Sequence, residues 1–306
     1  MHRGKIIAKK GRHKVIECIK CGFKHLYPIP SKSDLEKFYR NKYFTLIKKG
    51  GRAPEIRRLL KCGKEALREK KWLQSTLYGD IDYIIKKNIL SKGRKIICDI
   101  GCGKGDFITY MTRKGWEAIG IEPSAEIRFS QKLIIYNLSL EEFIIRYPEY
   151  KNKFDAVTLL NVLEHVSNPI ETLRIVKLLL KPNRGILCIR VPNDFNKLQY
   201  LTENKLRIKE PWWIAIPDHI NYFSFESIKR LLESLNFKII YYQGDFPMEF
   251  FLLMGENYVK NPNIGGLCHK KRVNFELSLP DVERRRLYST LASIGIGRDC
   301  LIFAKS

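Results

Sequence analysis

The amino-acid sequence predicts an α/β fold in which helices cover both faces of a mainly parallel, doubly wound sheet. Short apolar segments rich in isoleucine, leucine and valine alternate with segments of helical character, as in parallel strands joined by crossovers. A turn with three glycines follows the first apolar segment, where such folds bind a ligand. We expect the strands near residues 95–100, 116–121, 133–136, 154–160, 185–191, 238–242 and 300–304.

The glycine-rich turn spans residues 99–106, with the sequence Asp-Ile-Gly-Cys-Gly-Lys-Gly-Asp. Glycine has no Cβ, so this turn can bring its backbone close to a nucleotide-like ligand at the N-terminus of the next helix. The dinucleotide fingerprint has two residues between its second and third glycines, whereas Gly105 falls one place early. With Asp99 before the glycines and Asp106 after them, the turn disfavours NAD and favours a cationic ligand.

Four segments in order resemble the motifs of the class I, seven-strand S-adenosylmethionine-dependent methyltransferases. The turn has the form D-x-G-x-G-x-G of their first motif. Glu122 ends the second strand, 21 positions after Gly101, where a carboxylate can accept both ribose hydroxyls. Residues 154–166 are similar to F-D-x-V-x-x-x-x-V-L-E-H, and residues 179–189 are similar to the L-K-P-G-G segment, with Asn-Arg in place of Gly-Gly.

This resemblance implies a Rossmann-like sheet of seven strands whose last strand is antiparallel, with S-adenosyl-L-methionine as the cofactor. In an open α/β sheet the ligand lies at the carboxyl ends of the strands, so the implied binding residues converge on one crevice. The residues implied are Asp99, Gly101, Cys102, Gly103, Gly105, Glu122, Pro123 and Asn161.

Two histidines are candidates for a general base, because a hydroxyl acceptor must lose a proton and histidine titrates near neutral pH. His219, preceded by Asp218, lies in a segment that resembles E-H-x-x-Y-F-S of sugar C-methyltransferases and related O-methyltransferases. The resemblance places this histidine at the acceptor, and Asp218, in place of the family's Glu, would orient or acidify the pair. Ile216 stands where an aromatic acid–base residue is expected, which disfavours C-methylation of a ketosugar. His165 follows Glu164 beside the cofactor, where it acts in catalysis or closes the cofactor pocket.

The first 45 residues contain a Cys-x-x-Cys turn at Cys18 and Cys21. This region resembles the second half of the zinc ribbon that precedes the methyltransferase domain in many relatives acting on sugars and metabolites. A structural zinc normally takes four ligands, but the first cysteine pair is absent and only His2, His13 and His25 could supplement the second. The sequence therefore predicts a degenerate site without a bound metal, and intact zinc binding is the alternative.

Composition shifts and helical periodicity divide the chain into four parts. Residues 1–45 form the zinc-ribbon-like unit and residues 46–94 a helical lead-in with an apolar stripe at three-to-four spacing. Residues 95–246 together with 297–306 form the cofactor-binding methyltransferase domain. Residues 247–296 form a helical insertion before the last strand.

The net charge of +24 is concentrated near the N-terminus: residues 1–95 carry 27 lysines and arginines against 8 acidic residues, a balance of +19. Such a surface favours an anionic partner, although basic solvated faces alone could account for it. No apolar run reaches the roughly 18 residues that span a bilayer, and no secretory signal is evident. Together with eight cysteines that do not form a disulfide framework, this predicts a cytoplasmic protein without a membrane span.

These observations lead to one principal function and two alternatives. The principal hypothesis is methylation of a hydroxyl on a glycan, nucleotide-sugar or small metabolite, most consistent with an anionic acceptor. The first alternative is an RNA methyltransferase that uses the basic N-terminal third, although no nucleic-acid-binding motif supports it. The second is a non-catalytic scaffold that binds the cofactor.

Overall fold

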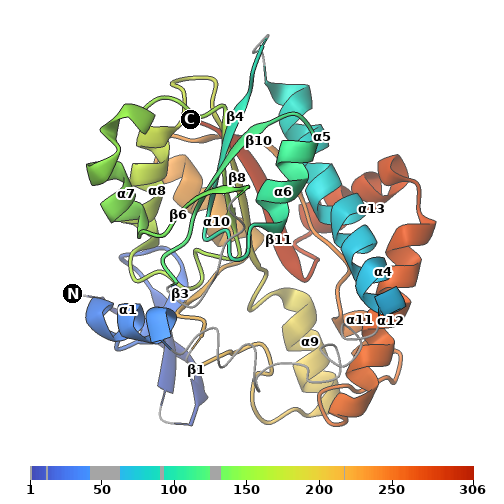
Figure 1. Ribbon diagram of the computed structural model, residues 1–306. Helices are drawn as coiled ribbons and strands as arrows, with labels where there is room; N and C mark the ends of the chain where they lie inside the picture. The colour runs from blue at the N-terminus through green and yellow to red at the C-terminus, as the bar shows by residue number, and fades with distance from the viewer. Residues whose placement is uncertain (1, 12, 42–62, 90–92, 125–131, 217) are drawn as a thin grey trace.

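The computed structural model describes residues 2–11, 13–41, 63–89, 93–124, 132–216 and 218–306, and its centre is a seven-stranded sheet (Figure 1). The strand order is β10-β11-β8-β7-β4-β5-β6. β4 to β8 are mutually parallel where they pair, and β11 is antiparallel to both of its neighbours. The strands are β4 Ile96–Ile100, β5 Glu117–Ile121, β6 Ile134–Tyr136, β7 Ala156–Leu160, β8 Ile186–Pro192, β10 Lys238–Gln243 and β11 Asp299–Lys305. The predicted fold class is therefore confirmed.

Helices cover both faces of this sheet because alternate residues of each strand point to opposite sides. In β7, Val157 packs with the core beneath α7, α8 and α10, whereas Ala156 packs with the core beneath α5 and α6. Both residues are fully buried, as expected for a parallel strand covered on two sides. These helices are α5 Gly79–Asn88, α6 Asp106–Arg113, α7 Leu140–Arg146, α8 Pro169–Leu179 and α10 Phe225–Ser234.

Helices α7, α8 and α10 begin at side chains that accept hydrogen bonds from free backbone N–H groups. Asn168 caps α8 ahead of a proline at the first helical position, and Ser224 caps α10 through a capping box with Ser227. Ser139 and Glu142 form a capping box at α7. Because each cap involves residues close together in the chain, the sequence itself marks where these helices begin.

The lead-in to the sheet is helical but interrupted. α4, Gly63–Leu73, continues through a π-helical turn at Gln74–Tyr78 into α5. The apolar stripe of this lead-in buries Ile81, Ile84 and Ile85 against the sheet, as predicted. Residues 46–62 and 90–92 of the predicted lead-in lie outside the described residues.

The N-terminal unit is completed by a strand from elsewhere in the chain. Its antiparallel sheet has the order β1-β2-β3-β9, and it lies below α7 and α8 in Figure 1. The strands are β1 Gly4–Lys10, β2 His13–Cys18, β3 Lys24–Tyr27 and β9 Asn221–Tyr222. Helix α1, Lys32–Asn41, follows β3 in the chain. Val15 and Leu26 share a core with Trp213 and Tyr222, so the N-terminal unit packs on residues that lie both before and after His219 in the chain.

The predicted insertion before the last strand is helical and packs beside α4, as Figure 1 shows at the right of the molecule. Its elements are α11 Glu249–Leu253, the 3-10 turn η3 Pro262–Ile264, α12 Gly265–Ser278 and α13 Asp281–Ser293. The 3-10 turn η2 Pro148–Tyr150 and helix α9 Lys197–Leu206 lie elsewhere in the chain. His269 of α12 contacts Glu69 of α4 at 2.9 Å. The limits of the four predicted parts remain predictions.

Candidate active site

The glycine-rich turn leaves the carboxyl end of β4 in the left-handed conformation that glycine tolerates. Gly101 has φ 68° and Gly103 has φ 54°. A Cβ on Gly101 would lie 2.6 Å from Val162 Cγ2, so this glycine lets the turn pack against the loop after β7. A Cβ on Gly103 would meet nothing within 4 Å, so the turn presents an open backbone surface there.

The carboxylate of Glu122 lies directly beside this open surface. Gly103 N–H donates to Glu122 Oε2 at 2.9 Å, and Ser124 N–H donates to Glu122 Oε1 at 3.0 Å. Each oxygen keeps further acceptor capacity, which a vicinal diol such as ribose can use. Burial raises the pKa of Glu122, partly offset by these two N–H donors. The turn and this carboxylate therefore fit a nucleoside ligand.

Asp99 lies on β4 just before the turn and is almost fully buried. Thr158 Oγ1 donates to Asp99 Oδ1 at 2.5 Å. Burial raises the pKa of Asp99 to about 7, while the Thr158 hydrogen bond acts in the opposite direction. A cationic ligand at the turn would favour the ionised form of this carboxyl.

We expect this shift to make cofactor affinity depend on pH. The pKa of Asp99 in the folded protein lies above its ordinary value. Between these two pKa values the folded state therefore holds a proton that the unfolded state has lost. Because of this, the contribution of Asp99 to the free energy of unfolding falls as the pH rises towards 7. Binding of a sulfonium should therefore strengthen by up to about tenfold per pH unit as the pH rises to about 7. Calorimetric titration at several pH values measures this.

The matched control is S-adenosylhomocysteine, which lacks the sulfonium charge and should show a shallower pH dependence. Asp99→Asn should flatten the profile for S-adenosylmethionine. A dissociation constant for S-adenosylmethionine that does not change between about pH 6 and 8 contradicts the assignment of Asp99.

Three of the predicted cofactor-binding residues, Cys102, Gly105 and Pro123, differ from the others in their surroundings. The Cys102 side chain is buried in the core, where its Sγ occupies the space that a Cβ on Gly120 would need, so only its backbone can face a ligand. Gly105 is the N-cap of α6, with φ 80°, and packs under Leu133. Pro123 is exposed after Glu122.

The loop after β7 holds Asn161 in a left-handed conformation, with φ 60°. Asn161 Nδ2 donates to Glu164 Oε1 at 3.0 Å, and Arg190 Nη1 donates to Asn161 Oδ1. Asn161 N–H also donates to the Arg190 carbonyl at 2.8 Å. The side-chain amide of Asn161, which the sequence assigns to cofactor binding, is therefore held by Glu164 at its nitrogen and by Arg190 at its oxygen.

The structure brings together the three predicted catalytic residues. The rings of His165 and His219 meet edge to face with centroids 5.0 Å apart. His165 Nδ1 lies 2.8 Å from the Asp218 carbonyl oxygen and 3.3 Å from Asp218 Oδ1. Because a carbonyl oxygen only accepts, Nδ1 of His165 carries the proton. His219 is half-buried, and its backbone N–H donates to the Ala215 carbonyl at 2.7 Å.

Backbone contacts join this histidine segment to the loop after β7. The N–H groups of Ile220 and Asn221 both donate to the Glu164 carbonyl, at 2.8 and 3.0 Å. Asn221 Nδ2 donates to the carbonyls of Leu163 and Val166 at 2.9 and 2.7 Å. The predicted cofactor loop and the predicted acceptor segment are therefore one unit, although some fifty positions separate them in the sequence.

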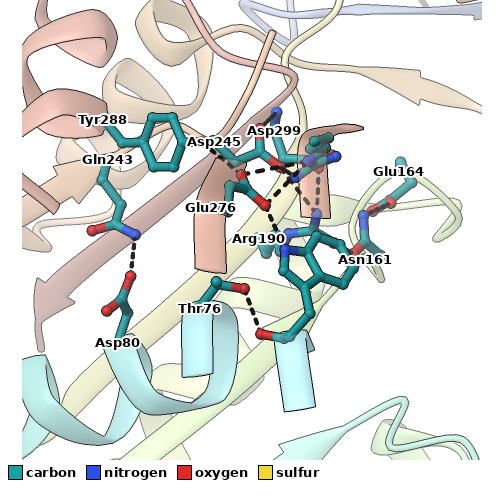
Figure 2. A network of polar contacts seen from close by, with 12 residues as sticks. Thr76, Asp80, Asn161, Glu164, Arg190, Gln243, Asp245, Glu276, Tyr288 and Asp299 are labelled. Carbon is teal, nitrogen blue, oxygen red and sulfur yellow. Dashed lines mark hydrogen bonds and ion pairs between the residues drawn. The ribbon is translucent and has the colours of Figure 1, made fainter. Parts of the chain in front are cut away.

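A buried network of charges lies behind Asn161, and the sequence did not indicate it (Figure 2). Arg190 Nη2 donates to Asp299 Oδ2 and lies 3.5 Å from Asp245 Oδ2. Arg272 of the insertion donates to the same Asp245 oxygen at 2.7 Å. Burial would raise the pKa of Asp245, but Arg272 and Arg190 hold it below its ordinary value. The one sequence signal for this network is the alternation of charged residues with apolar strand segments.

The network continues to the lead-in helices. Asp80 accepts from Gln243 and from Arg284 at 3.0 Å each, and Tyr288 donates to Glu276 at 2.6 Å. The side chains surround a small cavity of about 40 Å³. The sheet, the lead-in and the insertion are thus joined by buried polar contacts on one side of the site.

The N-terminal unit brings together four residues that could bind a metal. Of the three histidines considered with Cys18 and Cys21, His2 and His25 lie beside the two cysteines, and the four ligand atoms are all within 4.8 Å of one another. His13 is not in this group. The degenerate site without a bound metal stays a prediction. Across the described part of the chain, no helix is both long and apolar enough to span a bilayer.

Comparisons with known proteins agree with this geometry. Residues 70–242 match the family described as "Methyltransferase domain". The ubiquinone biosynthesis O-methyltransferase of Actinobacillus pleuropneumoniae serotype 5b (strain L20) is 32% identical over 117 residues, which are 35% of this chain and 49% of that protein. The tRNA U34 carboxymethyltransferase of Desulfotalea psychrophila is 31% identical over 141 residues, 44% of each chain. The chain thus spans about half the length of these curated relatives.

Among solved structures, the chain is similar to a SAM-dependent methyltransferase from Archaeoglobus fulgidus, with a TM-score of 0.50 and 18% identity over 87% of this chain and 100% of that chain. At this identity the likeness concerns the fold alone. The family match covers more than half of the sequence and includes the glycine-rich turn, Glu122 and Asn161. The chain therefore belongs to the class I S-adenosylmethionine-dependent methyltransferases, in the family described as "Methyltransferase domain".

Proposed function

We propose that this chain transfers a methyl group from S-adenosylmethionine to a hydroxyl group of a small-molecule, nucleotide-sugar or glycan acceptor. When bound, the cofactor supplies a methyl group already activated on a sulfonium. The backbone at Gly101 and Gly103, the carboxylate of Glu122 and the amide of Asn161 would bind and orient it. Positioning and exclusion of water then supply most of the acceleration.

The observation that carries this proposal is the pairing of His165 and His219 at the carboxyl end of β7. A hydroxyl must lose its proton as its oxygen forms the new bond to carbon, and a histidine can accept that proton near neutral pH. His165 already donates from Nδ1 to the Asp218 carbonyl, so we assign it a positioning role. His219, which contacts the His165 ring, is the proposed proton acceptor.

The names of relatives support a hydroxyl acceptor. Several of the similar curated proteins are called ubiquinone biosynthesis O-methyltransferases, including that of Histophilus somni, 34% identical over 103 residues. Ile216, half-buried against the core of the N-terminal unit, provides no acid–base group three positions before His219. This arrangement favours O-methylation over C-methylation of a ketosugar.

The test uses S-adenosylmethionine with an isotope-labelled methyl group and a small-molecule extract of the host. The wild-type chain should transfer the label to a metabolite, detected by mass spectrometry as a shift of one methyl group. His219→Ala should lower the transfer rate by about 10²- to 10⁴-fold, because it removes the proton acceptor, and leave cofactor affinity unchanged. His269→Gln, in the insertion, is the matched control. Wild-type transfer rates in His219→Ala contradict the proton-acceptor role.

A second candidate, RNA methylation, is favoured by the similarity to tRNA U34 carboxymethyltransferases and by the basic N-terminal third. Here the label should appear in the RNA fraction, and binding should weaken steeply with salt because counterions are released from phosphates. Cofactor binding without transfer to metabolites or RNA would instead support the non-catalytic scaffold.

A further inference from the structure

Four cysteine and histidine side chains, of the kinds that bind metals, meet at the turn between β2 and β3 of the N-terminal unit. His2 Nδ1 lies 3.6 Å from Cys18 Sγ and 3.3 Å from Cys21 Sγ. In tetrahedral zinc sites, bonds of about 2.3 Å to sulfur and about 2.0 Å to nitrogen place neighbouring ligand atoms roughly 3.3–3.8 Å apart. The two distances from His2 fall in this range, and all four ligand atoms lie within 4.8 Å of one another.

The fourth side chain, His25, is oriented as metal-binding histidines are. It is fully buried, and its Nδ1 lies 2.8 Å from the Leu26 carbonyl oxygen. Since that oxygen only accepts, Nδ1 carries the proton and Nε2 has the lone pair. Nε2 is buried and has no hydrogen-bond partner among the described residues. A backbone partner on one ring nitrogen and a metal on the other is the usual arrangement at zinc sites.

The backbone holds the two cysteines on one turn. Gly22 N–H donates to the Cys18 carbonyl at 2.9 Å, and Cys18 N–H donates to the Phe23 carbonyl at 3.2 Å. Cys18 and Cys21 are free cysteines and do not form a disulfide. The antiparallel pairing of β1 with β2 places Gly4 opposite Cys18, which brings His2 back over the turn. Fifteen residues separate His2 from Cys18, so only the sheet brings them together.

We propose that His2, Cys18, Cys21 and His25 bind one Zn²⁺ and that this ion anchors the strand on which the acceptor segment rests. Both thiols lose their protons to solvent on binding, and the two thiolates balance the charge of the ion while both imidazoles stay neutral. Thiolate and imidazole ligands in a tetrahedral set select zinc over magnesium or calcium.

The anchoring role follows from how β3 contacts the rest of the chain. His25 pairs with Asn221 of β9, and Leu26 N–H donates to the Ile220 carbonyl at 2.8 Å. Asn221 in turn holds the loop after β7 through its side-chain amide. The proposed ion therefore sits one strand away from the segment that carries His219. The zinc site itself does not depend on the proposed acceptor.

The experiment measures metal content in the untagged full-length chain, purified without chelator, by inductively coupled plasma mass spectrometry. We expect about one zinc per chain, as for a four-ligand structural site. Cys21→Ser and His25→Ala should each lower the zinc content at least about tenfold. His13→Ala is the matched control for the histidine, and Cys268→Ser for the cysteine, and both should keep the metal. Retention of zinc in the Cys21→Ser and His25→Ala variants overturns the ligand assignment.

A second measurement needs no variant. Chelated wild-type protein titrated with Co²⁺ should give the visible absorption of tetrahedral cobalt with thiolate ligands. A wild-type chain without zinc and without this absorption overturns the site. Hydrogen exchange on the same chelated protein should increase in residues 24–27 and 219–222, with cofactor affinity unchanged. Unchanged exchange there overturns the anchoring role.

Discussion

Arg190→Met is expected to lower the free energy of unfolding by about 3–5 kcal/mol, the usual cost of breaking a buried ion pair. Arg190 lies between Asp245 and Asp299 and also holds Asn161 (Figure 2). Methionine has a similar length but no charge, so Asp245 and Asp299 stay close together without the arginine between them, and Arg272 and Arg298 alone compensate them among the described residues. Chemical denaturation followed by circular dichroism measures the loss.

The same substitution should weaken cofactor binding, because Asn161 loses one of the two side chains that orient its amide. Arg174→Met is the matched control: its ion pair with Glu171 is exposed on α8, and its loss should cost less than about 1 kcal/mol. Adding Asp299→Asn to Arg190→Met should recover part of the stability, since one unpaired carboxylate is then neutral. An Arg190→Met protein as stable as Arg174→Met would show that the network contributes little.

Glu122→Ala is expected to reduce affinity for S-adenosylmethionine at least about 100-fold. Hydrogen bonds to a charged group contribute about 1.5–3 kcal/mol each, and the proposed contact with ribose uses both carboxylate oxygens. Gly103 N–H and Ser124 N–H orient those oxygens at the mouth of the turn. Isothermal titration calorimetry measures the dissociation constant.

Glu117→Ala is the control for this variant, because Glu117 begins the strand that Glu122 follows and its carboxylate makes a partly exposed ion pair with Arg94. It should bind the cofactor as the wild type does. Glu122→Gln should be intermediate, since one oxygen remains as an acceptor. Equal affinities for wild type and Glu122→Ala would remove Glu122 from the cofactor site.

Much of the fold could be predicted because its signals are local. Continuous apolar segments such as residues 154–160 mark strands buried on both faces, and the strand positions agree with the structure within a few residues. Glycines in the turn after β4 mark a backbone conformation that other residues rarely adopt. The carboxyl ends of parallel strands meet at one edge, which is why the sequence alone predicts that Gly103 and Glu122 lie together.

Contacts that join distant segments could not be predicted. Arg190, Asp245 and Arg272 are ordinary charged residues in the sequence, and only packing of the insertion against the sheet buries them together. Cys102 fits the cofactor motif by position, but the size of the neighbouring residue, Gly120, decides that its side chain enters the core.

The sequence by itself determined the α/β alternation, the glycine-rich turn and the family, because each depends on residues close together in the chain. Only the tertiary structure decided that His2 and His25 complete the cysteine pair and that β9 joins the N-terminal sheet to the His219 segment. The physical reason is that antiparallel pairing sets the distance between these side chains. The short strands of the N-terminal sheet could pair in several registers, and packing of the buried core selects one of them.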